Sequence, residues 1–382
     1  FHKLEPEGSN FHKYSYMGMI GNYMLMMFYT TITGWMFYYL YKMLVGGFNG
    51  LSVEQIGGVL GALVSDPVTM TGYMALAVVS GFGVCYLGVQ TGVERITKFM
   101  MSCLLLLMIA LAVNSVLLPG GEKGLEYYLL PDFSRLAQYS ANEVIFAAMG
   151  QAFFTLSLGI GSLAVFGSYI GKEKRLTGEA LYVIMLDTFV ALMSGLIIFP
   201  ACSAFNIDPG AGPNLLFVTL PNVFNHMAGG QFWGALFFLF MTFAAMSTVI
   251  AVFENLIACI YDLTGWDRRK IISLGTVAII LLSLPCIFGF NIWSDIQPLG
   301  KGSAILDLED FLVSNNLLPL GSLIYLAFCT SRYGWGWDNF IREADTGEGV
   351  KFPRGLRFYL TYILPIIVLY IFINGYIARS EE

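Results

Sequence analysis

The chain has 382 residues, of which 57% are hydrophobic and only 12% are charged. A soluble domain cannot hide that much apolar surface, so the composition excludes a soluble globular protein and predicts a protein that lies in a lipid bilayer. The formal net charge of -6 adds little, because the location of charges in a membrane protein matters more than their sum.

Apolar runs long enough to cross a bilayer follow one another along the chain. The predicted spans are 17–44, 70–89, 97–118, 142–170, 178–204, 231–262, 270–290, 306–330 and 356–378. These runs lack the period of two that a membrane β-barrel needs. The sequence therefore predicts an all-α, polytopic membrane helical bundle with about nine spans, forming a single transmembrane domain over 1–382.

The basic residues predict an orientation. If the chain changes sides at each span, fifteen of the 20 Lys and Arg residues fall on one side, together with the N-terminus. Cytoplasmic loops carry an excess of Lys and Arg, so we expect the N-terminus inside and the C-terminus outside.

The span over 142–170 carries small and polar residues at its centre, where a lipid-facing helix would carry leucines. They are Gly150, Thr155, Ser157, Gly159, Gly161 and Ser162. Such a stretch can unwind inside the membrane, and its free N–H and C=O groups then become ligands for ions and for the charged ends of a substrate. Small residues also suit the close packing of intact helices, and this pattern alone leaves both interpretations open.

The span over 178–204 carries Asp187 near its middle. A carboxylate at that depth costs about 3 kcal/mol unless a cation or hydrogen bonds compensate it, so we interpret Asp187 as functional. The alternative is a protonated aspartate with a structural role, paired with a neighbouring helix.

The span over 231–262 contains two adjacent hydroxyls, Ser247 and Thr248. With a backbone carbonyl of the segment 244–248 they could supply hard oxygen ligands for an alkali cation, or they could bond back to their own helix. Glu254 follows about two turns later. It could be a gate, a proton site or half of a buried ion pair, and the sequence does not choose.

Four segments, in matching order, resemble the neurotransmitter:sodium symporter family, and most closely its bacterial amino-acid-transporting branch with eleven helices. The segments lie at 28–35, 150–161, 217–230 and 244–248. The resemblance covers essentially the whole chain. It implies the inverted-repeat sodium symporter fold, with family helices 3 to 11 present, and an extracellular re-entrant loop over 205–230.

The resemblance also implies a substrate site and its gate. The implied substrate-binding residues are Leu25, Tyr29, Phe154, Ser157, Ile160, Thr248 and Val252. Tyr29 matches a tyrosine that binds the substrate carboxylate, and Phe154 and Asp310 match the gate. Because most of the pocket residues are apolar or small, we expect a neutral, hydrophobic or aromatic amino acid.

Two sodium sites are implied as well. Their ligands in this chain are Thr155, Asp187, Ala244, Ser247 and Thr248. Asp187 stands where many members have asparagine, and Ala191 stands where chloride-dependent members have serine. Since a fixed carboxylate can balance sodium without an anion, we expect no chloride requirement.

Two departures from the family pattern stand out. Ser102 replaces the proline that often follows a glycine, here Gly92, by ten positions, which predicts less pronounced unwinding. Residues 1–9 resemble the cytoplasmic loop after the second family helix, so we interpret the chain as N-terminally truncated. Because the first helix normally completes both sodium sites, we expect the 382-residue chain alone not to transport.

The function that follows is sodium-coupled symport of an amino acid into the cell by alternating access, in the bacterial cytoplasmic membrane. The expected partners are the amino acid and the lipid bilayer, with no nucleic acid. The sequence does not decide the oligomeric state, and a homodimer is one of the alternatives. No nucleotide loop, nucleophile motif or zinc-ligand spacing appears, so we expect neither an enzyme nor a metal ion other than sodium. The alternatives are a proton-coupled amino-acid transporter, using Asp187 or Glu254, and an inactive truncated membrane protein.

Overall fold

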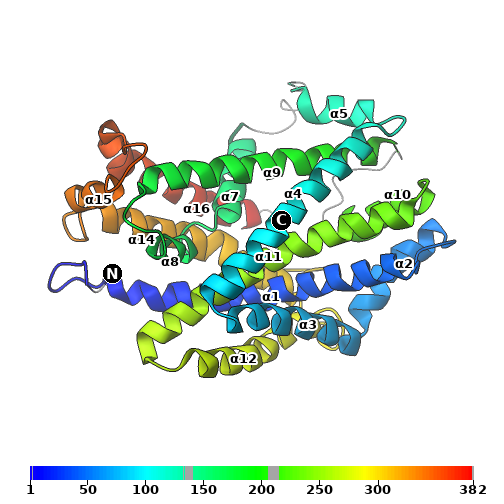
Figure 1. Cartoon of the computed structure of the whole chain (residues 1–382), viewed down its shortest axis with the longest axis horizontal. Coiled ribbons are helices and arrows are strands. Elements are labelled where there is room, and N and C mark those ends of the chain that lie inside the picture. Colours follow the sequence, from blue (N-terminus) through cyan, green and yellow to red (C-terminus); the bar gives the residue numbers. More distant parts are fainter. Residues whose placement is uncertain (2, 132, 134–140, 205–214, 381–382) are drawn as a thin grey trace. The chain divides into compact units, whose positions relative to one another are not determined.

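The structure is a computed structural model that describes residues 1–382 apart from 2, 132, 134–140, 205–214 and 381–382. Most of the described residues are helical, and no β-strand occurs among them. The helices are α1 (Tyr14–Leu44), α2 (Val53–Ser65), α3 (Pro67–Tyr86), α4 (Arg95–Val116), α5 (Glu122–Leu129), α7 (Ala141–Thr155), α8 (Ser162–Ser168), α9 (Leu176–Ala204), α10 (Leu220–His226), α11 (Gly230–Thr264), α12 (Arg268–Phe288), α13 (Ile305–Phe311), α14 (Leu318–Thr330), α15 (Trp337–Ala344) and α16 (Leu364–Ser380). Figure 1 shows their order along the chain. The prediction of an all-α protein is confirmed.

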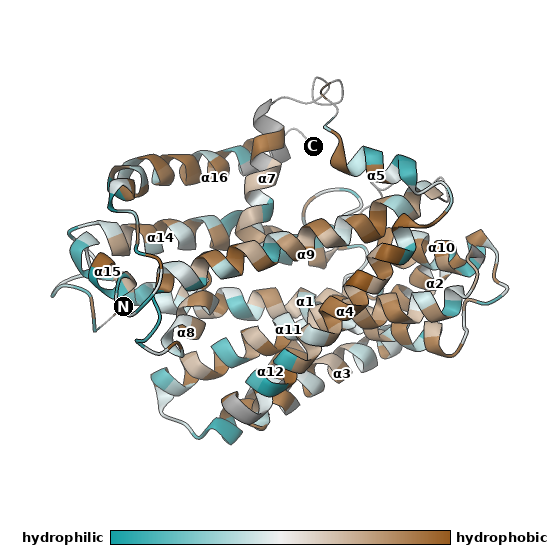
Figure 2. Cartoon of the chain, turned by 45° about the horizontal axis from the view of Figure 1, so that its top comes forward, coloured by the Kyte–Doolittle hydropathy of each residue, from teal (hydrophilic) through white to brown (hydrophobic). Residues whose placement is uncertain are grey.

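Among the described residues, seven helical segments are long and apolar enough, by length and composition, to cross a membrane. They are Pro67–Tyr86, Gly92–Val116, Leu176–Ala204, Gly230–Thr264, Arg268–Phe288, Ile305–Thr330 and Arg354–Asn374. Figure 2 shows hydrophobic residues along most of α4, α9 and α16, whereas the short α5 carries hydrophilic residues. Each of these segments corresponds to a predicted span.

The two remaining predicted spans correspond to α1 and to the α7–α8 pair. α1 has 31 residues, but its tyrosines, threonines and glycines lower its hydropathy. The span predicted over 142–170 is divided into α7, with 15 residues, and α8, with 7, and each is shorter than the bilayer is thick.

The chain divides into two compact units. Unit 1 comprises Phe1–Leu25, Ser134–Thr188 and Leu308–Glu382, and unit 2 comprises Met26–Phe133 and Phe189–Asp307. Two helices contribute to both units, because α1 changes unit after Leu25 and α9 changes unit after Thr188.

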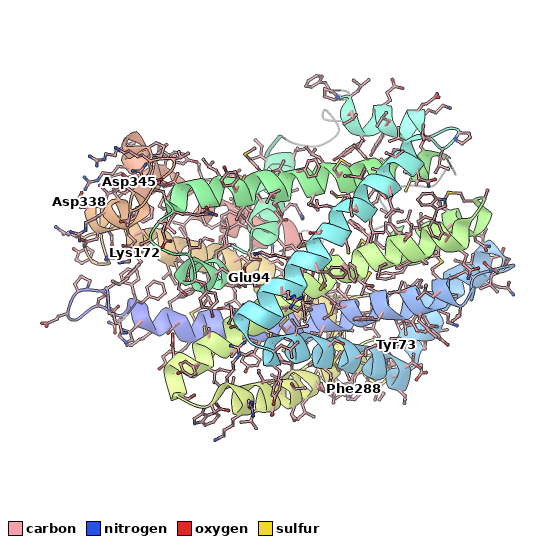
Figure 3. All side chains as sticks on the ribbon, in the orientation of Figure 1. Tyr73, Glu94, Lys172, Phe288, Asp338 and Asp345 are labelled. Carbon is pink, nitrogen blue, oxygen red and sulfur yellow. The ribbon has the colours of Figure 1, made fainter. Side chains whose placement is uncertain are left out.

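At one end of unit 1, the loop that follows α8 is bonded to the loop that follows α15. The guanidinium Nε of Arg175 donates a hydrogen bond of 3.0 Å to the carbonyl of Asp345. Figure 3 shows Lys172 and Asp345 at this same end. The contact joins two segments that the distribution of basic residues predicts on one side of the membrane, in agreement with the predicted order of spans.

Unit 2 is held by close helix packing around α3. A Cβ atom on Gly34 of α1 would lie 2.7 Å from the backbone nitrogen of Met74, so only glycine allows this approach of α1 to α3. On another side of α3, the rings of Phe82 and Phe253 stack with centroids 3.9 Å apart, which ties α3 to α11.

Two predictions about local structure have different outcomes. α4 runs unbroken through Ser102, whose hydroxyl donates to the carbonyl of Lys98 at 2.8 Å, in agreement with the limited unwinding predicted there. The re-entrant loop predicted over 205–230 is described only in part. Residues 205–214 lie outside the described residues, and the rest contains a π-turn over Leu215–Thr219 followed by α10.

Candidate functional site

The helix predicted over 142–170 is interrupted between Thr155 and Ser162. Ser157, Gly159 and Gly161 adopt left-handed backbone conformations with φ of 49°, 89° and 88°. Ser157 is the only described residue other than glycine with a positive φ. Since the left-handed region interrupts the α-helical hydrogen-bond ladder, these residues explain the break, and the unwound interpretation of this segment holds.

The unwound backbone also packs tightly against α14. A Cβ atom on Gly159 would lie 2.4 Å from the carbonyl oxygen of Leu318, and one on Gly321 would lie 2.2 Å from the carbonyl oxygen of Gly159. The hydroxyl of Tyr14 in α1 donates a hydrogen bond to the same Gly159 carbonyl. The small residues therefore serve both purposes that the sequence left open, because they unwind the helix and let a neighbouring helix approach.

Unit 1 brings together two of the predicted sodium ligands. The hydroxyl of Thr155, at the end of α7, donates a hydrogen bond of 2.9 Å to the carboxylate of Asp187 in α9. The Asp187 side chain is thus directed at the point where α7 ends. Its carboxylate, the Thr155 hydroxyl and the adjacent unwound carbonyls are hard oxygen donors, the type that an alkali cation prefers.

The two predicted gate residues line one cavity in unit 1. The cavity measures 320 Å³, and Phe154 and Asp310 contribute to its wall together with Gln151 and Asn315. The carboxylate of Asp310 accepts a hydrogen bond of 2.7 Å from Ser314, one turn further along the chain. An aromatic ring and an oriented carboxylate on one cavity are compatible with the predicted gate.

Unit 2 presents its candidate oxygens on an intact helix. The Ser247 hydroxyl donates to the Ala244 carbonyl at 2.7 Å, so these two oxygens are adjacent on α11. The side chains of Tyr29 in α1 and Thr248 in α11 are hydrogen-bonded to each other. Val252 follows one turn after Thr248 and is buried. In unit 2, a predicted substrate-binding residue, Tyr29, is therefore bonded to a predicted ligand of the second sodium ion, Thr248.

Glu254 is half of a buried ion pair, which the sequence offered as one of three roles. Its carboxylate is fully buried and accepts hydrogen bonds from both terminal nitrogens of Arg268, one of them at 2.9 Å. The same guanidinium donates to the carbonyl of Cys85 near the end of α3 at 2.9 Å. Arg268 thus compensates the buried charge and donates to a carbonyl in the last turn of α3, which also accepts a hydrogen bond from the backbone N–H of Gly88 at 3.1 Å.

The predicted site residues are divided between the units. Unit 1 contains Leu25, Phe154, Thr155, Ser157, Ile160, Asp187 and Asp310, and unit 2 contains Tyr29, Ala244, Ser247, Thr248 and Val252. Sequence reasoning missed Asn22 and Tyr14, which bond to the unwound backbone. The spacing of Gly18, Gly21 and Asn22 on one face of α1 was the available signal for a close approach at that point.

The described residues fit sodium better than a transition metal. Among them, no group of three His, Cys, Asp or Glu side chains converges as metal ligands. The oxygens that do come together are carboxylate, hydroxyl and carbonyl oxygens. Such oxygens suit sodium, whereas imidazole and thiolate ligands suit zinc or copper.

A discontinuous apolar helix that ends at a carboxylate and a hydroxyl, as α7 does at Asp187 and Thr155, is typical of secondary transporters with broken helices. The sequence pattern of the Sodium:neurotransmitter symporter family matches residues 53–381, and the chain belongs to that family. It is 31% identical over 379 residues to the uncharacterised sodium-dependent transporter YhdH of Bacillus subtilis, covering 98% of this chain and 81% of that protein. A sodium-dependent transporter of Haemophilus influenzae is 30% identical over 386 residues, with 98% and 82% covered.

A solved structure is similar over nearly the same length. The crystal structure of MhsT in complex with L-phenylalanine has a TM-score of 0.85 and 33% sequence identity, and covers 96% of this chain and 82% of that chain. These comparisons confirm the predicted family and the sodium symporter fold. The protein is an integral membrane protein that performs sodium-dependent transport of a small molecule, in a family of transporters rather than enzymes.

Proposed function

We propose that this protein carries a neutral, hydrophobic or aromatic amino acid into the cell together with sodium, by alternating access. The observation that carries the proposal is the hydrogen bond of 2.9 Å between Thr155 and Asp187 beside the unwound segment. It joins a carboxylate that can bind a cation to a stretch of unwound backbone, and sodium-coupled transport of a zwitterion needs both. The similarity to a transporter solved with L-phenylalanine supports an aromatic or other apolar substrate.

The residues suggest how the substrate is held. Tyr29 offers a hydroxyl to the substrate carboxylate, and the unwound backbone beside Ser157 offers N–H and C=O groups to its charged ends. Leu25, Ile160 and Val252 are apolar and buried, so they suit an apolar side chain and reject a charged one. Phe154 closes over the substrate, and Asp310 takes part in the same gate.

Sodium drives the cycle by gathering oxygen-bearing groups around one ion. We assign Thr155 and Asp187 to one sodium and Ala244, Ser247 and Thr248 to a second. When bound, each ion is coordinated by these oxygens and makes the closed arrangement more favourable. Because Asp187 supplies a fixed negative charge, no chloride is needed.

We further propose that the protein lies in the bacterial cytoplasmic membrane with its N-terminus inside. The contact between Arg175 and Asp345 supports this topology, because it joins two loops that the proposal assigns to the cytoplasm. A homodimer is compatible with the proposal and is not required by it.

The test is uptake of a panel of labelled amino acids in proteoliposomes by the chain together with family helices 1 and 2, which the resemblance implies are needed to complete both sodium sites. We expect uptake of neutral apolar amino acids that requires an inward sodium gradient and is unaffected when gluconate replaces chloride. Uptake that follows a proton gradient and ignores sodium would instead select a proton-coupled transporter. A chloride requirement in the unaltered protein would overturn the role given to Asp187.

A further inference from the structure

Asn22 of α1 is almost completely buried, with 1% of its surface exposed, and its side-chain amide contacts the unwound segment. The Nδ2 atom donates to the carbonyl of Gly18 in its own helix at 2.7 Å and to the carbonyl of Ile160 at 2.9 Å. Its Oδ1 atom accepts a hydrogen bond from the hydroxyl of Ser162 at 3.4 Å. The amide of Asn22 therefore bonds both to a residue within the break and to the first residue of α8.

The carbonyl of Ile160 needs this donor. Interruption of the helix removes the backbone N–H that would otherwise bond to it, and Ile160 is 3% exposed, so water has little access. A buried carbonyl without a partner is costly. Asn22 replaces the missing helical partner.

The neighbouring residues of α1 are small enough to allow the contact. A Cβ atom on Gly18 would lie 3.4 Å from the Ile160 carbonyl oxygen, and one on Gly21 would lie 3.7 Å from the Ile160 side chain. Larger residues at these positions would hold the unwound backbone away from α1. The two glycines thus bring the Ile160 carbonyl within reach of the amide.

We propose that Asn22 is a positioning residue that fixes the direction of the Ile160 carbonyl and, with it, the substrate-facing geometry of the unwound segment. The inference rests on the proposed function, because Ser157 and Ile160 are proposed to form the pocket wall. Asn22 itself does not contact the substrate. Substrate affinity and selectivity therefore depend on a side chain that lies behind the site.

The experiment compares Asn22→Leu and Asn22→Asp with a matched control, Asn291→Leu. Asn291 in unit 2 makes the same kind of contact, because its Nδ2 atom donates to the carbonyl of Ile287 four residues earlier at 3.0 Å and to the carbonyl of Val64 in another segment at 2.9 Å. Asn22→Leu removes donor and acceptor at similar size. Asn22→Asp keeps the shape but places a carboxyl oxygen opposite two carbonyl oxygens.

Two measurements are made on each full-length variant. Hydrogen–deuterium exchange should rise in peptides covering residues 156–168 for both Asn22 variants, and should stay at the unaltered level there for Asn291→Leu. Sodium-dependent uptake should show the KM for substrate raised about tenfold in the Asn22 variants, with kcat much less changed and the preference between large and small apolar amino acids reduced. Asn291→Leu should leave the KM unchanged even if its Tm falls equally.

The outcomes separate the two proposals. If the unaltered protein shows no sodium-dependent uptake, the proposed function fails, and the exchange measurement still tests the contact. If it does transport, an unchanged KM in Asn22→Leu, or an equal KM increase in Asn291→Leu, overturns the positioning role. Unchanged exchange over 156–168 in both Asn22 variants overturns it as well.

Discussion

The broken helix α7–α8 in unit 1 and the intact helix α11 in unit 2 present candidate sodium ligands in different ways. The break frees main-chain groups by placing Ser157, Gly159 and Gly161 in left-handed conformations. α11 keeps its ladder over 35 residues and presents the Ala244 carbonyl and neighbouring hydroxyls from its surface. Freed carbonyls need partners from other helices, here Asn22 and Tyr14, whereas a carbonyl within a helix already has one.

The difference shows which substitutions should disturb each region. The unwound segment depends on tertiary contacts for its backbone, so small changes in its neighbours alter its geometry. The backbone groups of α11 are hydrogen-bonded within the helix. The group of α11 that most needs a partner from another helix is the buried carboxylate of Glu254. Substitutions in the two regions should therefore differ in size and in the property that they change.

The largest loss of stability should come from Arg268→Ala, which tests the buried ion pair between Glu254 of α11 and Arg268 of α12. Removal of the guanidinium leaves Glu254 buried without its cation, and breaking a buried pair in this way costs about 3–5 kcal/mol. Thermal unfolding in detergent should show a large fall in Tm. Arg269→Ala is the control, since this neighbouring guanidinium lies over the ring of Tyr86, 5.5 Å from its centroid, and its loss should change the Tm little. Equal Tm values for the two variants would contradict the argument.

Gly159→Ala should have the next largest effect and tests the broken helix. Its φ of 89° is unfavourable for alanine, and the new Cβ would lie 2.4 Å from the Leu318 carbonyl oxygen. Strain and overpacking together should cost about 2–3 kcal/mol and reduce uptake sharply.

The matched control for that substitution is Gly150→Ala in α7. A Cβ atom there would meet nothing within 4 Å, so alanine should be neutral or slightly stabilising in this helix. If Gly150→Ala and Gly159→Ala lower stability and uptake equally, the break does not require glycine at position 159.

Asp187→Asn should have a smaller effect, on ion affinity rather than on stability. The fixed charge beside Thr155 is lost while the shape is kept, and we expect the sodium concentration for half-maximal uptake to rise about tenfold. Combined with Ala191→Ser, the same substitution should introduce a chloride requirement. Unchanged sodium activation in Asp187→Asn would show that this carboxylate is not a sodium ligand.

The smallest loss of stability should come from Asp66→Ala. Asp66 is the N-cap of α3 and belongs to neither candidate ion site. The Thr69 hydroxyl, with the backbone N–H groups of Thr69 and Val68, donates to Asp66 and holds the pKa of its carboxyl below the ordinary value of 3.8. Because the pKa is lowered by folding, the stabilisation is present above the ordinary pKa and is lost as the pH falls through the lowered one.

The Tm difference between Asp66→Ala and the unaltered protein should therefore be small at neutral pH and should vanish in strong acid. Asp295→Ala, at an exposed loop position, is the control. A Tm difference that grows as the pH falls would contradict the role of Asp66 as a cap.

Much of the architecture could be predicted because lipid imposes a strong constraint on sequence. A run of about 20 apolar residues has few structural options other than a spanning helix, and seven predicted spans correspond to helices of that kind. The division of 142–170 into two helices was harder to predict, since glycines also occur in continuous membrane helices. The role of Glu254 was open because its partner, Arg268, lies 14 residues further along the chain on another helix.

The sequence by itself determined that this protein is an all-α membrane protein of the sodium:neurotransmitter symporter family, with oxygen-bearing residues at the depths where sodium and substrate would bind. The tertiary structure alone decided that Asn22 and Tyr14 satisfy the unwound backbone, that Gly159 fits against α14, and that Arg268 compensates Glu254. The physical reason is that hydropathy and local conformational preference are properties of each residue and its near neighbours in the sequence. The partner of a freed carbonyl or of a buried charge instead depends on which helices pack together.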